Sequence, residues 1–379
     1  MPDLNMPITK ITVNNRRLTC FRLSVKAVLV SIILVNALSC WASDQKMATA
    51  ESEKIILSQS LGWSSWSQWL DPVWRGQYPV VGDPSVILDK NLLRMYYTCF
   101  DPDKQSPTLC LAISGDGFNW DHVDTGAVEE GWLRGRVIET RIGTWEDTHE
   151  TPEIIKWKGK YLLYFSGYVQ RGNLLENFPA HLGLARSTDG IHFTRYSDKP
   201  ILRTTSGWYD HDAIFSPSVI EHDGKLFMVY AGHCWTKCDS DPGVFILGAS
   251  SSDGITWEKQ KSPLIEKSMM PPWFEQWAGE PELIKGTDGY FYLFFTAVGE
   301  EKPYALGVAR SVSPFGPWQI NPEPIVVTTP DHFAETEVVA PSVLIDGDKV
   351  RMWFSGFSND NHIAIGYAEA AWPLFTYND

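Results

Sequence analysis

The chain has 379 residues, of which 44% are hydrophobic and 21% are charged, and its formal net charge is −14. This apolar content is too high for a disordered chain and is sufficient for a large buried core. The acidic balance argues against a partner such as nucleic acid or an anionic membrane, which would require a basic face. The 29 Gly and 24 Pro indicate many turns and argue against a long helical bundle.

The first 42 residues have the pattern of a secretory signal peptide. An apolar run over 27–38 follows a basic stretch and is short for a bilayer span. The basic residues are Lys10, Arg16, Arg17, Arg22 and Lys26. Small residues favour cleavage after Ala42, whereas lipoprotein processing at Cys40 fits less well because the preceding residues make a poor lipobox. We therefore expect an exported protein, periplasmic or secreted, with no membrane association after processing.

Cleavage would leave four of the six cysteines. In an oxidising compartment these can form two disulfides in three pairings. We favour Cys99–Cys110 and Cys234–Cys238. A metal site is disfavoured, because no Cys-x-x-Cys pair or Cys/His cluster accompanies them.

A fivefold repeat is the most informative feature of the chain. Five segments share a core in which any residue is followed by Pro, then Ser or Glu, then two apolar residues. The prolines lie 68, 65, 64 and 60 residues apart. The cores are Asp83–Ile87, Thr151–Ile155, Ser216–Ile220, Glu280–Ile284 and Ala340–Leu344.

Each core is followed by an aromatic and β-branched run and by a third short run, which have the composition of strands. In three repeats the third run ends in an Asp-Gly turn, at 116–117, 189–190 and 253–254, which favours a tight hairpin over a calcium loop. We expect a fourth short strand at 137–138, 200–202, 263–265 and 324–326. Repeated tryptophans are expected to fill the wedges between repeats; they are Trp120, Trp157, Trp257, Trp318 and Trp353.

Four antiparallel strands repeated five times predict an all-β fold, a five-bladed β-propeller over residues 76–379. The fifth repeat lacks an outer strand after Ala368. We expect residues 43–75 to supply that strand or to close the ring.

The first strand of each propeller blade lines the central axis, so the residues before the five prolines should converge there. Two of them, Asp83 and Glu280, are acids in blades that are not neighbours. A base and an acid about 6.5–9.5 Å apart, with a water between them, are the arrangement of an inverting glycosidase. The alternative is that both acids cap strands or bind a structural cation. We expect Glu153 and Glu282, which follow prolines, to point away from the axis, and Glu153 is the stronger candidate of the two.

Further polar and aromatic residues lie close to the starts of the inner strands, where they can bind sugar hydroxyls or stack on sugar rings. The candidate substrate-binding residues are His149, Glu150, Glu153, His211, His332, Glu337, Trp145 and Trp277.

The Asp-Pro of the first repeat and the Glu-Pro of the fourth resemble the five-bladed propeller glycosidases of families 43, 62, 32, 68, 117 and 130. The resemblance covers about residues 76–370 and is closest in motif order to family 43. It implies that Asp83 is the base and Glu280 the acid. Ser216 stands where that family has a second Asp-Pro, so the resemblance implies Asp212, or Asp210, as the residue that modulates the pKa of the acid. The acid of family 117, a His, keeps His211 and His332 as candidates.

The resemblance implies a carbohydrate partner, a plant or algal oligosaccharide or polysaccharide, and glycosidic bond hydrolysis without a required cofactor. A structural Ca²⁺ in the central channel, as in some relatives, is a further expectation. Two alternatives stay open, namely a glycan-binding propeller without catalysis and a glycoside phosphorylase.

Overall fold

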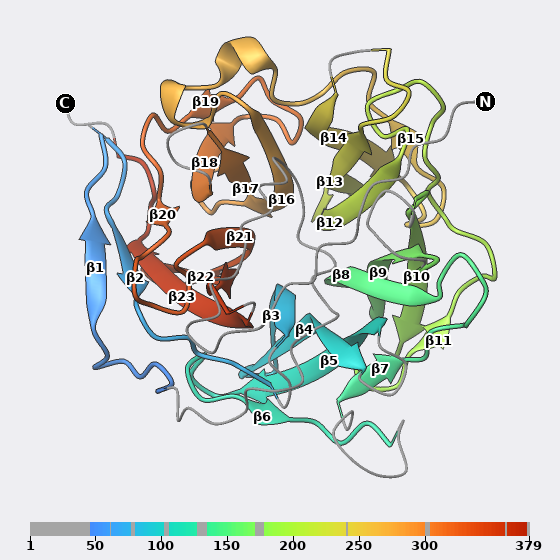
Figure 1. Cartoon of the computed structure of the whole chain (residues 1–379), viewed down its shortest axis with the longest axis horizontal. Coiled ribbons are helices and arrows are strands. Elements are labelled where there is room, and N and C mark those ends of the chain that lie inside the picture. Colours follow the sequence, from blue (N-terminus) through green and yellow to red (C-terminus); the bar gives the residue numbers. More distant parts are fainter. Residues whose placement is uncertain are drawn as a thin grey trace, which may run out of the picture. The chain divides into compact units, whose positions relative to one another are not determined.

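The computed structural model describes residues 46–60, 62–76, 80–101, 106–126, 135–170, 178–239, 242–299, 304–360 and 362–376. These residues belong to one compact unit and form five antiparallel sheets arranged as a ring (Figure 1). The predicted leader, residues 1–42, lies outside the described residues. In the described part of the chain, no helix is long and apolar enough to cross a membrane.

Each sheet is one blade, and its strands follow the chain from the axis outward. Blade one contains β3 (Val81–Asp89), β4 (Leu92–Asp101), β5 (Ser106–Ser114), β6 (Asp121–His122) and β7 (Arg136–Ile138). Blade two contains β8 (Thr148–Trp157), β9 (Lys160–Tyr168), β10 (His181–Ser187) and β11 (Thr194–Arg195). Blade three contains β12 (Ala213–His222), β13 (Lys225–Cys234), β14 (Gly243–Ser251) and β15 (Glu258–Lys259).

Blade four contains β16 (Trp277–Lys285), β17 (Phe291–Val298), β18 (Ala305–Ser311), β19 (Gln319–Ile320) and β20 (Val326–Val327), and two 3-10 turns, η2 (Lys267–Met269) and η3 (Pro272–Phe274), precede it. Blade five contains β21 (Glu337–Asp346), β22 (Lys349–Phe357) and β23 (Ile363–Ala371). The inner strands contact one another in the order β3, β8, β12, β16 and β21, and β21 contacts β3. The predicted all-β, five-bladed propeller with four-stranded antiparallel blades is confirmed.

The N-terminal segment completes blade five. β2 (Trp66–Trp69) pairs antiparallel with β23, and β1 (Lys54–Leu57) pairs with β2. The outer edge of the last blade is therefore built from the start of the described chain, which ties the two ends of the propeller together by backbone hydrogen bonds.

The outer edges of blades one to four differ in detail from the expected single fourth strand. In blade one, β6 pairs with the end of β5 at Ala112–Ile113, and β7 pairs with its beginning at Leu109–Cys110. In blade four, β19 likewise pairs with the end of β18 at Ala309–Arg310, and β20 pairs with its beginning at Ala305–Leu306. In blades two and three the fourth strands are β11 and β15 instead, and the expected segments 200–202 and 263–265 form no strand. Leu202 makes an isolated bridge with Leu182, and the Leu264 N–H donates to Ile246 O.

The inner strands all bulge at the proline. Pairing shifts register between the residues that flank each X-Pro step, for example between Gly82 and Ser85 of β3. All five residues before the prolines have positive φ, between 47° and 51°; they are Asp83, Thr151, Ser216, Glu280 and Ala340. A non-glycine residue in this region costs roughly 1–2 kcal/mol. Bulges re-aim side chains, so the repeated bulge turns these five side chains toward the axis.

A closed ring of hydrogen bonds joins the blades one position beyond the prolines. In each blade, the Ser or Glu after the proline accepts a hydrogen bond from a backbone N–H of the next blade. The five bonds are Ile154 N to Ser85 Oγ, 3.0 Å; Val219 N to Glu153 Oε1, 2.7 Å; Leu283 N to Ser218 Oγ, 3.0 Å; Val343 N to Glu282 Oε1, 3.1 Å; and Val86 N to Ser342 Oγ, 2.9 Å. The Ser/Glu pattern of the repeat is thus an interblade contact.

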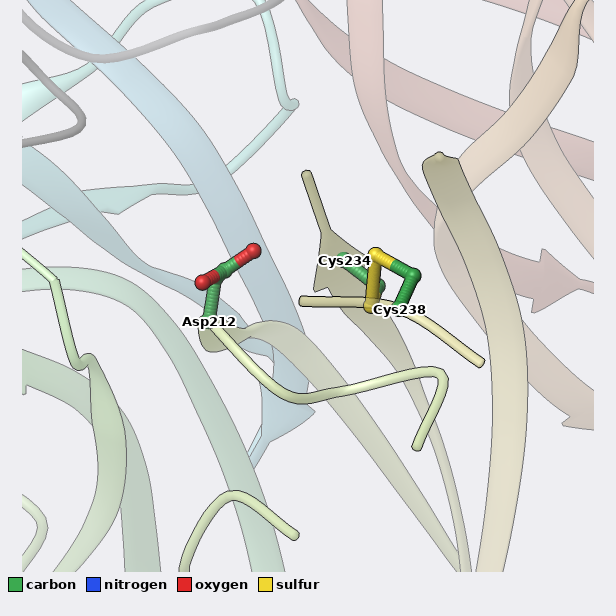
Figure 2. Close-up of side chains that lie close together, drawn as sticks. All are labelled: Asp212, Cys234 and Cys238. Carbon is green, nitrogen blue, oxygen red and sulfur yellow. A yellow bond between two sulfur atoms is a disulfide. The ribbon is translucent and has the colours of Figure 1, made fainter. Parts of the chain in front are cut away.

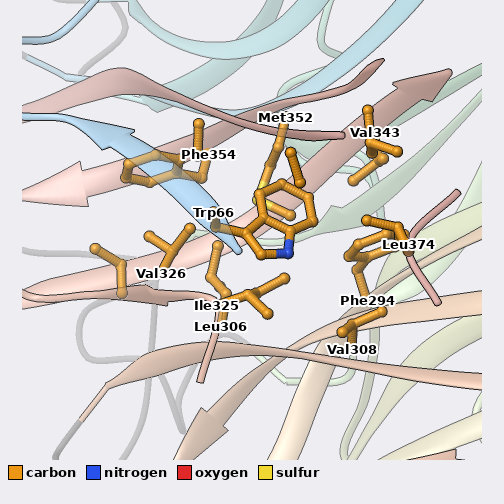
Figure 3. Close-up of a cluster of buried hydrophobic side chains, with 14 of the residues drawn as sticks. Trp66, Phe294, Leu306, Val308, Ile325, Val326, Val343, Met352, Phe354 and Leu374 are labelled. Atoms are coloured by element: carbon orange, nitrogen blue, oxygen red, sulfur yellow. The ribbon is translucent and has the colours of Figure 1, made fainter. Parts of the chain in front are cut away.

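Aromatic side chains fill the wedges between blades. Trp120 packs edge-on against Trp353 of blade five, and Trp257 against Tyr164 of blade two. Figure 3 shows the largest such cluster, where Trp66 of β2 lies among side chains of blades four and five, including Phe294 and Met352. Burial of this apolar surface stabilises the packing of neighbouring blades against each other.

Both favoured disulfides are present. Cys99–Cys110 joins the neighbouring strands β4 and β5, and Cys234–Cys238 closes a short loop after β13. Each restricts a segment of one blade, which reduces the conformational freedom of the unfolded chain.

Candidate active site

The axial ends of the inner strands enclose a small cavity of about 30 Å³, room for about two water molecules. Two tiers of residues line it: the five residues before the prolines with the prolines themselves, and the two glutamates that follow prolines. The lining residues are Asp83, Pro84, Thr151, Pro152, Glu153, Ser216, Pro217, Glu280, Pro281, Glu282, Ala340 and Pro341. The repeat therefore brings Asp83 and Glu280 to one cavity, as predicted from their positions.

Asp83 is held in place from two neighbouring blades. Its backbone N–H donates to Ser355 Oγ of blade five at 2.8 Å. Burial raises the pKa of its carboxyl to about 6, against the hydrogen bonds of the Thr98 hydroxyl and the Thr151 N–H, which lower it. Its Oδ1 is enclosed and has no hydrogen-bond partner among the described residues. A buried carboxylate oxygen without a donor can take a hydrogen bond from a water.

Glu280 keeps one oxygen occupied and one available. The Thr296 hydroxyl donates to Oε2 at 2.7 Å, and the Ala340 N–H of blade five lies 3.3 Å from the same oxygen. Burial, then the negative charges of Asp83 and Glu337, raise the pKa of Glu280 to about 8, against these two hydrogen bonds. At neutral pH the carboxyl is protonated. Because both donors bind Oε2, the proton lies on Oε1.

The two carboxyls therefore differ in protonation at neutral pH. With pKa values of about 6 and about 8, Asp83 is an anion and Glu280 a neutral acid. Pairs of carboxyls whose environments push their pKa values apart divide into a base and an acid. The arrangement can accept a proton at one side of the cavity and donate one at the other.

Glu153 and Glu282 form a second tier of carboxyls in the same cavity. The expectation that they point away from the axis is wrong, since both line the cavity together with Asp83 and Glu280. Each stands two residues after a residue that precedes a proline, and strand side chains two positions apart return to the same face. Glu153 accepts from Ser85 Oγ at 2.8 Å and from the Val219 N–H, and Glu282 accepts from the Val343 N–H. Burial raises the pKa of both carboxyls, that of Glu282 to about 7. The negative charge of Glu282 raises the pKa of Glu153 further.

These hydrogen bonds bear on the expected channel calcium. Calcium binds deprotonated carboxylates and other free oxygens. The oxygens of Glu153 that face the channel already accept bonds from neighbouring blades, as does Oε1 of Glu282. A carboxylate oxygen that accepts one hydrogen bond keeps a second lone pair for a cation, so the channel calcium stays an expectation.

Glu337, at the start of β21, lies on the acid side of the site. Its Oε2 is enclosed without a hydrogen-bond partner, and burial raises its pKa to about 7. Burial, and then the charges of Glu337 and Glu280, raise the pKa of Tyr304, whose ring meets Trp277 edge-on with centroids 6.3 Å apart. Sequence patterns missed Tyr304, because it precedes β18 at no repeated position.

Glu150 lies on the base side. The Tyr168 hydroxyl donates to Glu150 Oε1 at 2.9 Å. Burial, and then the charges of Glu150 and Asp83, raise the pKa of Tyr168, which places this tyrosine close to both acids. Tyr168 was missed as well; its only signal is its place at the end of β9, where the strand reaches the axial face.

Asp212 is bound by a loop instead of facing the cavity. Its Oδ2 accepts from the N–H groups of Trp235, at 2.5 Å, and Thr236, at 2.9 Å, and its Oδ1 accepts from the Thr236 hydroxyl at 2.5 Å. Figure 2 shows its carboxylate beside the Cys234–Cys238 disulfide. These three residues cluster at metal-ligand distances, but the sulfurs are bonded to each other and cannot ligate as thiolates.

Four more predicted site residues lie away from the axial cavity. His149 is buried against Phe165 with Nε2 3.2 Å from Glu146 Oε2. Trp145 stacks parallel to the same Phe165, and its Nε1 donates to the Asp198 carbonyl at 2.9 Å. His211 Nδ1 accepts from the Gly207 N–H at 2.8 Å, and His332 lies in a turn whose N–H donates to Thr329 O. The side chains of His149, Trp145 and His211 are thus engaged in loop and blade contacts, whereas the hydrogen bond of His332 is one of its backbone.

A five-bladed propeller with an anionic Asp and a protonated Glu in one axial cavity defines the class of the propeller glycosidases. The family model of glycosyl hydrolases family 43 matches residues 70–354. The chain belongs to this family, one of the several propeller glycosidase families that its sequence resembles.

Individual relatives are more distant. A sucrose-6-phosphate hydrolase of Zymomonas mobilis is 26% identical over 178 residues, 46% of this chain and 32% of that protein, so the match spans about a third of the relative's length. Among solved structures, a glycoside hydrolase has a TM-score of 0.61 at 16% identity and covers 83% of this chain and 92% of its own. An endo-arabinase of Bacteroides thetaiotaomicron has a TM-score of 0.56 at 17% identity, with 79% and 94% covered. At these identities the structures share the fold.

Proposed function

We propose that the protein hydrolyses a glycosidic bond with inversion, Asp83 acting as the base and Glu280 as the acid. Asp83 takes a proton from a water whose oxygen attacks the anomeric carbon. The bond from that carbon to the leaving oxygen breaks, and the leaving oxygen takes the proton of Glu280. Both proton transfers are made by side chains, so the proposal requires no cofactor.

The observation that carries this proposal is the split in protonation between two carboxyls of one cavity. Both are buried, and yet only Glu280 has its pKa raised above neutral, to about 8. An anion that lacks a donor on Oδ1 and a neutral acid are what an inverting hydrolysis needs at its two ends.

We propose a plant or algal oligosaccharide or polysaccharide as the substrate of an exported enzyme. The two disulfides are those expected in an oxidising compartment. The matched relatives are, by their names, a hydrolase of sucrose-6-phosphate and an endo-arabinase. A substrate panel therefore includes sucrose, its 6-phosphate and arabinan fragments beside other plant and algal oligosaccharides.

Glu150 and Trp277 are the proposed substrate contacts at the two sides of the cavity. Asp212 is not carried forward as the modulator of the acid, because its carboxylate oxygens accept hydrogen bonds from Trp235 and Thr236 and the charges that raise the pKa of Glu280 are those of Asp83 and Glu337. A Ser at the place of the second family Asp means that another carboxylate has to supply charge to the acid.

The experiment is sugar release from the panel by the wild type, Asp83→Asn and Glu280→Gln, with Glu335→Gln as a control on the neighbouring loop. We expect release by the wild type and the control, and a loss of at least about 10²-fold in each site variant on unactivated substrates. Glu280→Gln should keep more activity on aryl glycosides, whose leaving group needs no proton. Proton NMR of the first product shows whether the anomer is inverted.

Two outcomes would replace the proposal. Release that requires inorganic phosphate and yields a sugar phosphate would make the protein a phosphorylase. Binding of a glycan by the wild type and both site variants, with no release from any substrate, would make it a glycan-binding propeller.

A further inference from the structure

We propose that Glu337 is a positioning residue for Glu280: its negative charge keeps the acid protonated and stands in for the carboxylate that blade three lacks. This inference rests on the proposed function, in which Glu280 must carry a proton. It assigns to blade five the charge that the second Asp-Pro of family 43 would supply from blade three.

The fold places Glu337 beside the acid. β21 begins at Glu337, and three residues later the same strand donates the Ala340 N–H to Glu280 Oε2 at 3.3 Å and to Thr296 Oγ1 at 3.0 Å. The strand that carries Glu337 is thus bonded directly to the acid. Displacing its start would also move one of the two donors that Glu280 uses.

Glu337 is free to act by charge. Its Oε2 is enclosed and accepts no hydrogen bond in the described structure. An unpaired charge in a low-dielectric site acts over several ångströms. A carboxylate with donors on its oxygens would have that charge partly neutralised, as happens to Asp212 in its loop.

At the position before its proline, blade three has a serine instead of an acid. Ser216 occupies its position before the proline and donates its N–H to Thr151 Oγ1 at 3.0 Å. Asp212, the nearest acid along the chain, is bound by Trp235 and Thr236. The carboxylates whose charge raises the pKa of Glu280 are Asp83 and Glu337.

The titratable groups that face this pair are few among the described residues. Asp83 faces Glu280 from blade one, and Tyr304 faces both glutamates from the segment before β18. Thr296 and the Ala340 N–H oppose the effect, since they stabilise the anion of Glu280. Because Glu337 itself has a pKa of about 7, its charge appears in the range where the acid must hold its proton.

The test compares Glu337→Gln with Glu337→Asp and with Glu335→Gln, whose carboxylate accepts from the Asn359 N–H on the rim. Rates are measured against pH on the best substrate of the panel. Removing the charge lowers the pKa of Glu280, so the alkaline limb of Glu337→Gln should move down by about 0.5–1 pH unit. Glu337→Asp restores the charge and should return the limb to within about 0.3 unit of the wild type, and Glu335→Gln should leave it unchanged.

A second readout does not require activity. The carboxyl of Glu280 is titrated by ¹³C NMR of Glu-labelled protein, with Glu280→Gln identifying its signal. A downward shift of that titration in Glu337→Gln supports the inference, even if the wild type releases no sugar and the proposed function fails. An unchanged titration and an unchanged alkaline limb in Glu337→Gln would overturn it. An equal loss of rate in Glu337→Gln and Glu337→Asp at every pH would overturn it as well, because that pattern belongs to a contact with substrate or to packing.

Discussion

At the scale of single residues, the X-Pro step decides where the chemistry lies. The positive φ of Asp83 and Glu280 turns both carboxyls into a space too small to hydrate them fully. Burial then raises both pKa values, and the local donors and charges separate them. The same backbone feature thus produces the convergence of the acids and the environment that makes them different.

The pH dependence of catalysis follows from this separation. Asp83 must be deprotonated and Glu280 protonated, so kcat/KM should rise through pH about 6 and fall through pH about 8. Because the carboxyls interact, the two values belong to the pair. Initial rates at low substrate concentration from pH 4.5 to 9.5 measure the profile. A rate that keeps rising beyond pH 9 would contradict the role of Glu280.

The stability of the protein should also depend on Glu280. Its pKa is about 8 when folded and about 4.3 in an unfolded chain. Between these values the folded state holds a proton that the unfolded state has released, so stability is fully present at low pH and falls as pH rises. Glu280→Gln removes this loss and keeps an acceptor for Thr296. It should be more stable than the wild type by roughly 1–3 kcal/mol at pH 8.5.

Urea denaturation at pH 4.5 and pH 8.5 measures this difference. At pH 4.5 the two proteins should agree within about 0.5 kcal/mol, and Glu335→Gln should follow the wild type at both values. A variant that is less stable than the wild type at pH 8.5 would show that the folded protein favours the anion of Glu280.

At the scale of elements, the blade is a unit that repeats its contacts as well as its strands. The Ser or Glu after each proline receives an N–H from the next blade, so the blades are joined by side-chain acceptors at the axis. Two of these acceptors, Glu153 and Glu282, also line the cavity. The ring that holds the blades together therefore forms the floor of the candidate site.

Replacing one acceptor should weaken the ring. Ser218 is fully buried and accepts from the Leu283 N–H at 3.0 Å. Ser218→Ala leaves that N–H without a partner, which costs roughly 1–3 kcal/mol of unfolding free energy. Urea denaturation measures the loss, and Ser262→Ala, at an exposed position, is the control. Equal stability of the two variants would mean that water replaces the missing acceptor.

Repetition explains how much of this could be predicted from the sequence. The blades, the hairpin turns and the convergence of Asp83 with Glu280 could be predicted because each depends on a pattern that occurs several times. The interblade hydrogen bond of Glu282 could not, since its donor, the Val343 N–H, belongs to the next blade. Tyr168 and Tyr304 could not either, because they lie at unrepeated positions, and the donors that bind Asp212 come from a loop 23 and 24 residues away.

At the scale of the whole molecule, the propeller depends on a closure that no single blade provides. Blade five takes its outer strands from the start of the described chain, and β2 brings Trp66 into the cluster between blades four and five (Figure 3). Since Glu280 lies in blade four and Glu337 in blade five, this closure also fixes the positions of Glu280 and Glu337 relative to each other.

The variant Trp66→Ala should test the closure. Trp66 is 1% exposed and meets Phe294 edge-on with ring centroids 6.1 Å apart. Its truncation removes a large buried surface between two blades and should cost roughly 3–5 kcal/mol of unfolding free energy. Ile56→Ala on the neighbouring β1, where the side chain is 60% exposed, is the matched control and should stay within about 0.5 kcal/mol of the wild type. Urea denaturation gives both values.

Because the cluster joins the blades of Glu280 and Glu337, Trp66→Ala should also lower the rate of sugar release at temperatures where the protein remains folded. Full activity together with a large loss of stability would show that the inner ring of hydrogen bonds alone maintains the site.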